Sequence, residues 1–486
     1  MRIAIVGAGM SGLCMGTKLK AAGLDDFTIH EKADEVGGTW RENRYPGLSC
    51  DVPARFYSYS FAPNPGWSST FAPGPEIQRY FRSFADDQGL RPHIRFGSEV
   101  AEANWADSRW QLRTADGHED AADVLVTATG VLHHPRVPDI DGLETFAGRA
   151  FHTARWPDDL PPAALRDSSV AVIGTGSTGT QITAALAGEV KAYKLFQRTP
   201  QWILPVPSHT YSSITRRAFA RFPALSRLAY QAYERLFEST FGTAVIKDGW
   251  QRRLVSAACR LNLRMGVRDP DLRRRLTPDY EPMCKRLVMS GRFYPAIQRP
   301  GAELVTDRID HVEPGGIVTA DGTLHAVDVI VLATGFDFHA YMRPMEIVGR
   351  DGVTLAQAWA DGPRAYRTVS MPDFPNLFML MGPHSPVGNQ SLIAVAEAQA
   401  KYAMGFIEML RTGSARTVAP TAQATDRFNA ELRAALPDTV WTTGCVSWYM
   451  GQDGLPELWP WTPAHHRELL RRPELSDYEL VGVQAS

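Results

Sequence analysis

Residues 3–12 read Ile3-Ala4-Ile5-Val6-Gly7-Ala8-Gly9-Met10-Ser11-Gly12. A short apolar run leads directly into three glycines, and residues 13–20 then have the mixed pattern of a helix. The glycines permit a tight turn and let the backbone approach a pyrophosphate, whose charge the helix N-terminus stabilises. The stretch therefore predicts the strand, turn and helix of a dinucleotide-binding fold, with Gly7, Gly9 and Gly12 in its loop.

An acidic residue stands where such a fold needs one. The apolar run 27–30 ends at Glu31, nineteen residues after Gly12. A carboxylate in this position accepts hydrogen bonds from a ribose diol. The glycines alone would also fit an ordinary glycine-rich turn, but together with Glu31 they predict a site for FAD or NAD.

A second copy of the pattern follows. Residues 170–173 run into Gly174-Thr175-Gly176-Ser177-Thr178-Gly179, and the strand-like run 193–196 ends at Arg198, nineteen residues after Gly179. A guanidinium binds a 2′-phosphate through two parallel hydrogen bonds, whereas a carboxylate would repel it. We therefore expect NADPH here, held by Gly174, Gly176, Ser177, Thr178, Gly179, Arg198 and Thr199. The alternative for Arg198 is a solvated charge near a strand end.

Composition argues against several classes of protein. Lys and Arg (51) nearly balance Asp and Glu (53), which gives no reason to expect a nucleic-acid partner. No apolar run is long enough to span a membrane, and the first residues do not resemble a signal peptide, so we expect a soluble cytoplasmic protein. The cysteines predict neither a disulfide framework nor a zinc site, because they stand far apart at Cys14, Cys50, Cys259, Cys284 and Cys445. The same spacing disfavours a dithiol oxidoreductase, which leaves molecular oxygen as the expected electron acceptor.

A segment between the two glycine loops resembles a known family. It reads Phe146-Ala147-Gly148-Arg149-Ala150-Phe151-His152-Thr153-Ala154-Arg155-Trp156-Pro157, and it is similar at every defined position to the fingerprint of type I Baeyer-Villiger monooxygenases, Phe-x-Gly-x-x-x-His-x-x-x-Trp-Pro. The related flavin-containing N- and S-oxygenases differ at the Trp-Pro end. By itself His152 reads as an ordinary core or loop histidine; the resemblance implies a linker that couples the domains.

The resemblance extends to two further segments. Gly37-Gly38-Thr39-Trp40 and Cys50-Asp51 are similar to the family's flavin-contacting region, which implies that Gly38, Thr39, Trp40 and Asp51 bind FAD. Cys284-Lys285-Arg286 resembles the family's Cys-Lys-Arg segment, which implies a catalytic Arg286 and places Lys285 beside the NADPH phosphate. Without the family, Asp51 and Arg286 would equally fit a structural ion pair.

The expected fold is α/β, with two Rossmann-like dinucleotide-binding domains for FAD and NADPH and a helical insertion in the second. The chain's 486 residues exceed what one core usually supports. We expect an FAD-binding domain of residues 1–142 and 332–486, a linker of 143–160, and an NADPH-binding domain of 161–331. The insertion is a helical lobe at about 208–280, with helices near 214–222, 225–241 and 251–263. Two apolar runs, 124–130 and 329–335, close on Ala-Thr-Gly and mark crossings between domains.

The resemblance implies an FAD-dependent, NADPH-consuming enzyme that inserts one atom of O2 into a ketone through a peroxyflavin, giving an ester or lactone. Arg286 would stabilise the anion, since a guanidinium cannot supply the proton that quenches it, and Asp51 would orient Arg286. The alternatives are a flavin-containing N- or S-oxygenase and a non-catalytic flavin-bound redox sensor. The sequence leaves open the ketone, the pocket lining, the oligomeric state, and whether the arginine-rich lobe meets a membrane or is only solvated.

Overall fold

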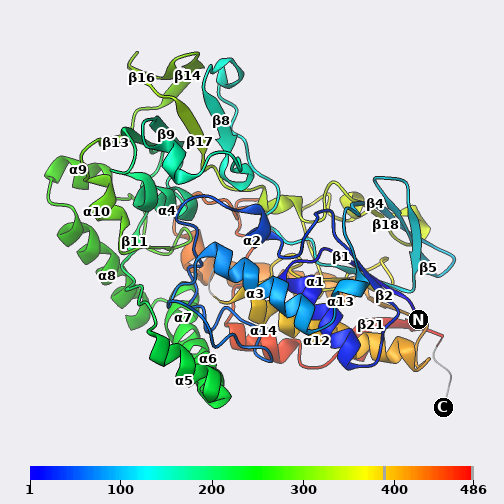
Figure 1. Cartoon of the computed structure of the whole chain (residues 1–486). Coiled ribbons are helices and arrows are strands. Elements are labelled where there is room, and N and C mark those ends of the chain that lie inside the picture. The colour runs from blue at the N-terminus through cyan, green and yellow to red at the C-terminus, as the bar shows by residue number, and fades with distance from the viewer. Residues whose placement is uncertain (387–389, 452, 483–486) are drawn as a thin grey trace.

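Two parallel five-stranded sheets organise the computed structural model, which describes residues 1–386, 390–451 and 453–482 (Figure 1). The strand order is β19-β7-β1-β2-β3 in the first sheet and β13-β10-β9-β17-β8 in the second. The first sheet consists of β1 (Ile3–Val6), β2 (Phe27–His30), β3 (Ile94–Arg95), β7 (Val124–Thr127) and β19 (Leu377–Met379). The second consists of β8 (Arg149–His152), β9 (Ser169–Ile173), β10 (Ala192–Phe196), β13 (Ala302–Val305) and β17 (Val329–Leu332).

Each sheet is built around one glycine loop. Every residue of β1, β7 and β17 is buried, as expected for parallel strands that are covered on both faces. The first loop ends in helix α1 (Met10–Ala21) and the second in α4 (Ser177–Leu186). The predicted α/β fold with two Rossmann-like units is therefore confirmed.

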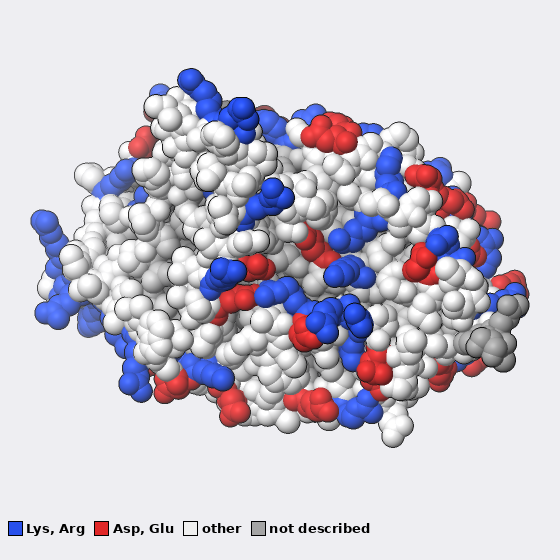
Figure 2. Space-filling view, turned by 90° about the horizontal axis from the view of Figure 1, so that it is seen from below, with Lys and Arg blue, Asp and Glu red and all other residues white. Residues whose placement is uncertain are grey.

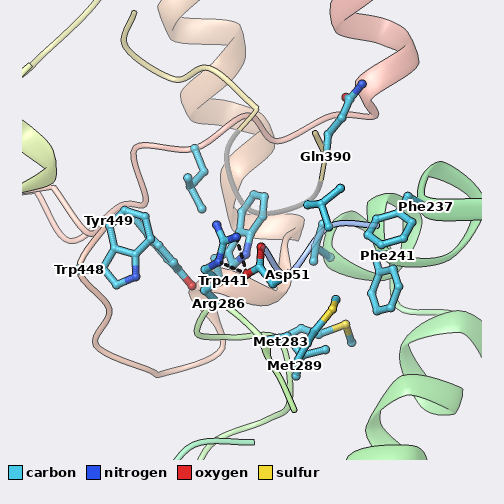
Figure 3. A pocket seen from close by; sticks show the side chains of 14 residues that line it. Asp51, Phe237, Phe241, Met283, Arg286, Met289, Gln390, Trp441, Trp448 and Tyr449 are labelled. Carbon is cyan, nitrogen blue, oxygen red and sulfur yellow. Dashed lines mark hydrogen bonds and ion pairs between the residues drawn. The ribbon is translucent and has the colours of Figure 1, made fainter. Parts of the chain in front are cut away.

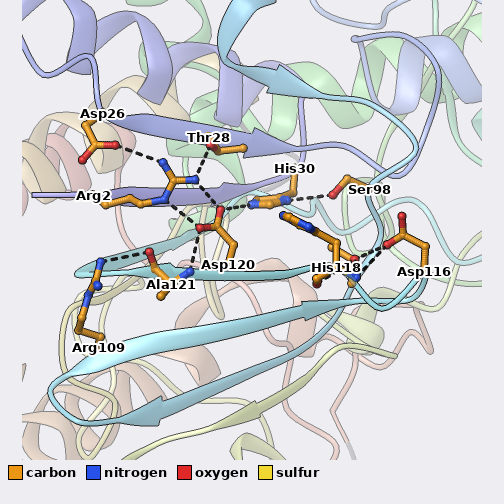
Figure 4. A network of polar contacts seen from close by, with 11 residues as sticks. Arg2, Asp26, Thr28, His30, Ser98, Arg109, Asp116, His118, Asp120 and Ala121 are labelled. Carbon is orange, nitrogen blue, oxygen red and sulfur yellow. Dashed lines mark hydrogen bonds and ion pairs between the residues drawn. The ribbon is translucent and has the colours of Figure 1, made fainter.

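A smaller sheet of β4 (Val100–Ala106), β5 (Arg109–Thr114), β6 (Glu119–Ala122) and β18 (Glu346–Val348) is fastened to the first unit by a polar network (Figure 4). Its centre is Asp120, which accepts hydrogen bonds from Arg2 at 2.7 and 2.9 Å and lies 3.3 Å from His30. His30 also lies 2.9 Å from the hydroxyl of Ser98. The network holds the end of β2, and with it Glu31, in place.

The predicted helical lobe is confirmed, with one change of boundary. The chain leaves the second unit after β11 (Ile203–Leu204) and returns at β12 (Val288–Met289), which pairs with β11 in parallel. Between them lie α5 (Ser213–Arg221), α6 (Pro223–Phe237), α7 (Thr243–Ile246), α8 (Trp250–Gly266) and α9 (Pro270–Arg275). The helix expected near 225–241 is instead α6 followed by a π-helical turn at Glu238–Gly242. Proline is well suited to the first position of a helix, which sets the start of α6 at Pro223.

The remaining elements complete the two units. They are α2 (Thr39–Glu42), α3 (Gly74–Asp87), α10 (Phe293–Ile297), α11 (Leu355–Ala358), α12 (Leu392–Arg411), α13 (Ala422–Ala435), α14 (Pro463–Leu469), β14 (Ile309–Glu313), β15 (Gly316–Thr319), β16 (Leu324–Ala326), β20 (Thr417–Pro420) and β21 (Tyr478–Val481). In Figure 1 the second sheet lies at the upper left, the lobe forms the left and lower-left rim, and α1 packs against α12 near the first sheet. None of the helices in the described ranges has both the length and the apolar composition that crossing a bilayer requires.

The expectation that the cysteines do not pair is wrong. Cys284 and Cys445 form a disulfide although 161 positions separate them in sequence. Separation along the chain says little about distance once the fold returns the C-terminal segment across the Cys-Lys-Arg segment. The spacing of the cysteines therefore argues neither for a reducing compartment nor against a dithiol oxidoreductase. Cys14, Cys50 and Cys259 are free and buried.

Candidate active site

The first glycine of each loop is required by its backbone. Gly7 and Gly174 have φ angles of +104° and +113°, which side chains other than glycine rarely adopt. A Cβ at Gly7 would lie 2.6 Å from the carbonyl oxygen of Ala128, and one at Gly174 would lie 2.4 Å from that of Ala333. Both alanines belong to the Ala-Thr-Gly segments, so the residues that follow β7 and β17 pack directly against the two glycine turns.

In each loop the third glycine allows close packing of the helix, and the second glycine leaves room for a ligand, as a dinucleotide site requires. A Cβ at Gly12 would lie 1.9 Å from the Gly7 oxygen, and one at Gly179 would lie 2.0 Å from the Gly174 oxygen, so both allow close helix packing. A Cβ at Gly176 would meet nothing within 4 Å, and one at Gly9 would meet only the backbone of Gly38, at 3.7 Å. The middle glycine of each loop thus leaves open space at a helix N-terminus, which fits a pyrophosphate.

Glu31 lies buried at the end of β2 and faces the first loop. Its carboxylate accepts hydrogen bonds from the backbone amides of Ala8 at 2.7 Å and Ala33 at 2.9 Å. These bonds fix the carboxylate beside the glycine turn and leave further lone pairs for a ribose hydroxyl.

Two cations meet beyond the second loop. Arg198 is exposed after β10 and forms no ion pair within the part of the chain that the structure describes. Lys285 lies over the ring of Tyr280 at 4.8 Å, and its pKa is lowered by burial and by the nearby Arg198 cation. The carbonyl of Thr199 accepts a hydrogen bond from Thr175 at 2.7 Å, which ties the two ends of the site together. Two neighbouring cations suit a phosphate group.

The segment around Asp51 joins the two units. Tyr45 donates a hydrogen bond to Gln181 of α4 at 3.0 Å, and Gln181 donates to the carbonyl of Ser49 at 2.9 Å. The hydroxyls of Thr178 and Tyr45 lie 3.5 Å apart. Helix α4, which starts at the second glycine loop, is thereby hydrogen-bonded to Ser49, two residues before Asp51 in the sequence.

Asp51 and Arg286 form a hydrogen-bonded ion pair. The carboxylate accepts from Arg286 Nη2 at 2.7 Å and from Nε at 3.2 Å, and the two side chains are 19% and 27% exposed. The neighbouring carboxylate raises the pKa of Arg286 further above its ordinary value. Arg286 lies two residues before β12 and three after Met283, whose φ of +73° is strained for a side chain of its size. A strained residue beside a charged pair is a common feature of functional sites.

An apolar pocket surrounds this pair (Figure 3). Phe237 and Phe241 of the lobe lie on one side, Trp448 and Tyr449 on the other, and Met283 and Met289 close the floor in the view of Figure 3. The rest of the lining comprises Val52, Val245, Leu287, Gln390, Trp441 and Leu458. A permanent cation inside largely apolar walls can stabilise a negative charge that develops on a bound molecule.

The C-terminal segment is held against the Cys-Lys-Arg segment by two links. One is the Cys284–Cys445 disulfide, and the other is a hydrogen bond that the Tyr449 hydroxyl donates to the carbonyl of Cys284. Residues 440–449 therefore form a wall of the pocket and contact the residues next to Arg286.

Trp40 and His152 have structural contacts of their own. Trp40, in the short helix α2 that starts at Thr39 after Gly38, donates its indole hydrogen to the Tyr57 hydroxyl at 3.0 Å. His152 accepts from the amide of Ala154 at 3.1 Å, so its other nitrogen, 2.9 Å from the carbonyl of Gly335, donates there. Burial lowers the pKa of His152. A neutral histidine with both nitrogens occupied ties the fingerprint segment to the second Ala-Thr-Gly crossing.

A family model described as flavin-binding monooxygenase-like matches residues 1–349. The chain belongs to this family. Among relatives of this flavin-binding monooxygenase, an uncharacterized monooxygenase of Mycobacterium tuberculosis is 56% identical over 98% of this chain and 96% of its own. A Baeyer-Villiger monooxygenase of Streptomyces coelicolor is 38% identical over 99% of this chain and 93% of its own. The resemblance that residues 146–157 indicated is confirmed.

Solved structures agree over the whole length of the monooxygenase. An oxidized steroid monooxygenase bound to NADP has a TM-score of 0.88 and 30% identity, with 99% of each chain covered. The OTEMO complex with FAD and NADP has a TM-score of 0.88 and 27% identity, again with 99% of each chain covered.

The monooxygenase also contains site residues that sequence reasoning missed. Three of them belong to no recognised motif: Tyr280, whose ring lies under Lys285, and the lobe residues Phe237 and Phe241. Tyr449 belongs to Ser447-Trp448-Tyr449, a segment that resembles only a subset of the family, and nothing in the sequence connects it with Cys284. The segment 384–391 gave no pocket assignment, and residues 387–389 of it lie outside the described residues.

Proposed function

We propose that the chain is an FAD-dependent, NADPH-consuming Baeyer-Villiger monooxygenase that inserts one oxygen atom of O2 into a ketone to give an ester or lactone. The observation that carries the proposal is the Arg286–Asp51 ion pair, fixed inside an apolar pocket. Relatives named Baeyer-Villiger monooxygenase and neighbours that contain FAD and NADP support it. The bound flavin would supply the redox chemistry by accepting a hydride from NADPH and reacting with O2.

The two loops would hold the two cofactors. Gly7, Gly9 and Gly12 would admit the FAD pyrophosphate and Glu31 would bind its ribose, while Gly38, Thr39, Trp40 and Asp51 would contact the flavin. For NADPH, Gly174, Gly176, Ser177, Thr178 and Gly179 would hold the pyrophosphate, and Arg198, Thr199 and Lys285 the 2′-phosphate. The open space at Gly176 and the paired cations beyond it support this assignment.

Arg286 would act on the ketone as a fixed positive charge. Negative charge develops on the carbonyl oxygen when a nucleophile adds to the carbonyl carbon, and a preorganised cation stabilises that charge. The raised pKa of Arg286 keeps its proton in place, so it does not neutralise the attacking anion. Asp51 would hold the guanidinium in position through its two hydrogen bonds, and the aromatic walls would exclude water.

We also propose the domain boundaries given above: an FAD-binding domain of residues 1–142 and 332–486, a linker of 143–160 and an NADPH-binding domain of 161–331. The separate sheets around β1 and β9 support two units, while β8 (Arg149–His152) of the linker is an edge strand of the second sheet and the boundary at 332 falls on the last residue of β17 (Val329–Leu332).

The test is product analysis of the purified flavoprotein with NADPH, air and a panel of cyclic and aryl ketones. The proposal expects products one oxygen atom heavier than the ketone, together with NADPH oxidation that rises when ketone is added. A thioether control separates the N- or S-oxygenase: sulfoxide formation with no ester from any ketone would refute the proposal. NADPH oxidation that no substrate accelerates would indicate the redox sensor instead.

A further inference from the structure

The helical lobe exposes an unusual share of the molecule's apolar side chains. Sixteen large apolar residues in the described ranges are exposed, and nine of them lie in this lobe, so its surface differs from the rest of the molecule. They are Ile214, Phe222, Leu225, Leu228, Leu236, Trp250, Leu254, Leu261 and Met265. Scattered exposed apolar residues are normal, but a concentration of them in one lobe marks an interaction surface.

On α8 these residues form one stripe. Successive residues of a helix are about 100° apart, which places Trp250, Leu254, Leu261 and Met265 within an arc of about 60°. Leu254 is 58% exposed and Met265 is 71% exposed. The opposite side of α8 is buried in the protein through Val255, Cys259 and Leu263. The outward stripe is therefore not needed to hold the helix in the fold.

On α6 the outward and inward faces have different partners. Leu225, Leu228 and Leu236 recur at spacings of three and eight residues and are exposed. The inward side carries Tyr230 and Phe237, both buried, and Phe237 lines the pocket around Arg286. One short helix thus separates an exposed apolar surface from the candidate active site.

The exposed stripes are accompanied by positive charge. Helices α5 to α8 contain Arg216, Arg217, Arg221, Arg227, Arg235, Arg252, Arg253, Arg260 and Arg264. Arg260 is paired with Glu281 at 2.9 Å and Arg252 donates to the carbonyl of Ala244, so the other seven supply the positive charge of this surface. Two of the three acidic residues between positions 213 and 266, Glu234 and Glu238, are occupied by ion pairs with Arg467. In the view of Figure 2 the left side, where the lobe lies, is mostly white with Lys and Arg along its edge.

We propose that this lobe surface docks on a bilayer of anionic phospholipid. An apolar stripe flanked by arginines matches the two components of such a surface, because apolar side chains enter the acyl boundary and cations bind the headgroups. In a docked lobe, helix α6 lies between the bilayer and the pocket, with Phe237 on its inward side. If the proposed function holds, the substrates are apolar ketones that partition into lipid and reach Arg286 through this wall.

The test is co-flotation of the flavin-loaded full-length protein with vesicles. Vesicles of phosphatidylcholine with 30 mol% phosphatidylglycerol, chosen for the test, are compared with phosphatidylcholine alone, at low and at physiological salt. The proposal expects the protein to float with the anionic vesicles, to float much less with neutral ones, and to lose binding as salt rises. No flotation with anionic vesicles at low salt overturns it.

Two pairs of variants locate the contact. Leu254→Ser combined with Leu261→Ser should lower vesicle binding at least tenfold, whereas the matched exposed pair Val137→Ser and Leu324→Ser should leave it unchanged. Equal effects of the two pairs would overturn the proposal. Flavin content and melting temperature confirm that each variant is folded.

Charge is tested in the same way. Arg253→Glu combined with Arg264→Glu should lower binding more than tenfold, since each arginine near an anionic surface contributes about fivefold in affinity. The exposed pair Arg79→Glu and Arg166→Glu, outside the lobe, should have little effect. Loss of binding in the second pair alone would place the contact elsewhere and overturn the proposal.

Two further results are decisive. If light scattering finds a dimer that the Leu254 and Leu261 changes convert to a monomer, the stripe is an interface between copies and the proposal fails. Flotation needs no turnover, so docking and ketone oxygenation are judged separately. A protein that floats but oxidises no ketone would refute only the proposed function.

Discussion

Arg286→Ala removes the cation that donates two hydrogen bonds to Asp51 in the pocket of Figure 3. A preorganised donor aimed at developing negative charge typically contributes 10²- to 10³-fold in rate, about 3 to 4 kcal/mol. The change also leaves a carboxylate that is only 19% exposed without its partner at 2.7 Å. We therefore expect ester formation to fall at least a hundredfold, while flavin reduction by NADPH continues.

The assay measures the two half-reactions separately. Flavin bleaching under anaerobic conditions follows reduction, and product and hydrogen peroxide are quantified in air. Arg286→Lys should recover part of the ester but release more peroxide, because one ammonium cannot reproduce both hydrogen bonds to Asp51 and is a stronger acid than a guanidinium. Arg149→Ala is the control, since it breaks an exposed ion pair with Asp159 at 2.8 Å that lies outside the pocket. Ester formation by Arg286→Ala at more than about a tenth of the parent rate would refute the role assigned to this guanidinium.

Three further changes test other parts of the structure. Arg198→Gln should raise the KM for NADPH about ten- to hundredfold with little change for NADH, as steady-state kinetics would show; equal losses for both cofactors would contradict a phosphate contact. Gly176→Ala should fold normally, since its Cβ meets no atom within 4 Å, but a titration should show weaker binding of NADPH. Gly179→Ala should instead lower the melting temperature, because its Cβ would lie 2.0 Å from the Gly174 oxygen. A lower melting temperature for Gly176→Ala with normal folding of Gly179→Ala would contradict the loop assignment. Burial lowers the pKa of His466 to about 3, so the unfolded chain binds a proton at this residue more strongly than the folded chain does. The free energy of unfolding should therefore be highest above about pH 6.5 and should fall by about 1.4 kcal/mol per pH unit on acidification toward pH 3. Denaturant titrations should show a shallower fall for His466→Gln, and an unchanged slope would contradict this.

The sequence predicted those features that local chemistry determines. A tight turn needs glycine at positions 7 and 174, and buried parallel strands need continuous apolar runs, so both sheets could be anticipated from short segments. The partnership of Asp51 and Arg286 was expected only through the family resemblance, because 235 positions separate them and no spacing rule connects them.

What could not be predicted depends on the path of the chain in three dimensions. Cys284 and Cys445 lie on segments that meet only after the C-terminal part of the chain crosses the pocket. The same holds for Tyr449, which contacts the Cys284 carbonyl, and for Phe237, whose inward direction depends on how α6 packs. Helix periodicity predicted the lobe, but not which of its faces would remain exposed.

The most direct test of the central claim is oxygenation of a cyclic ketone under ¹⁸O2 with NADPH, followed by mass spectrometry of the product. The proposed reaction predicts a lactone that carries one ¹⁸O atom per molecule, formed in proportion to the NADPH oxidised. NADPH oxidation that yields only hydrogen peroxide with every ketone, while thioethers become ¹⁸O-labelled sulfoxides, would contradict it.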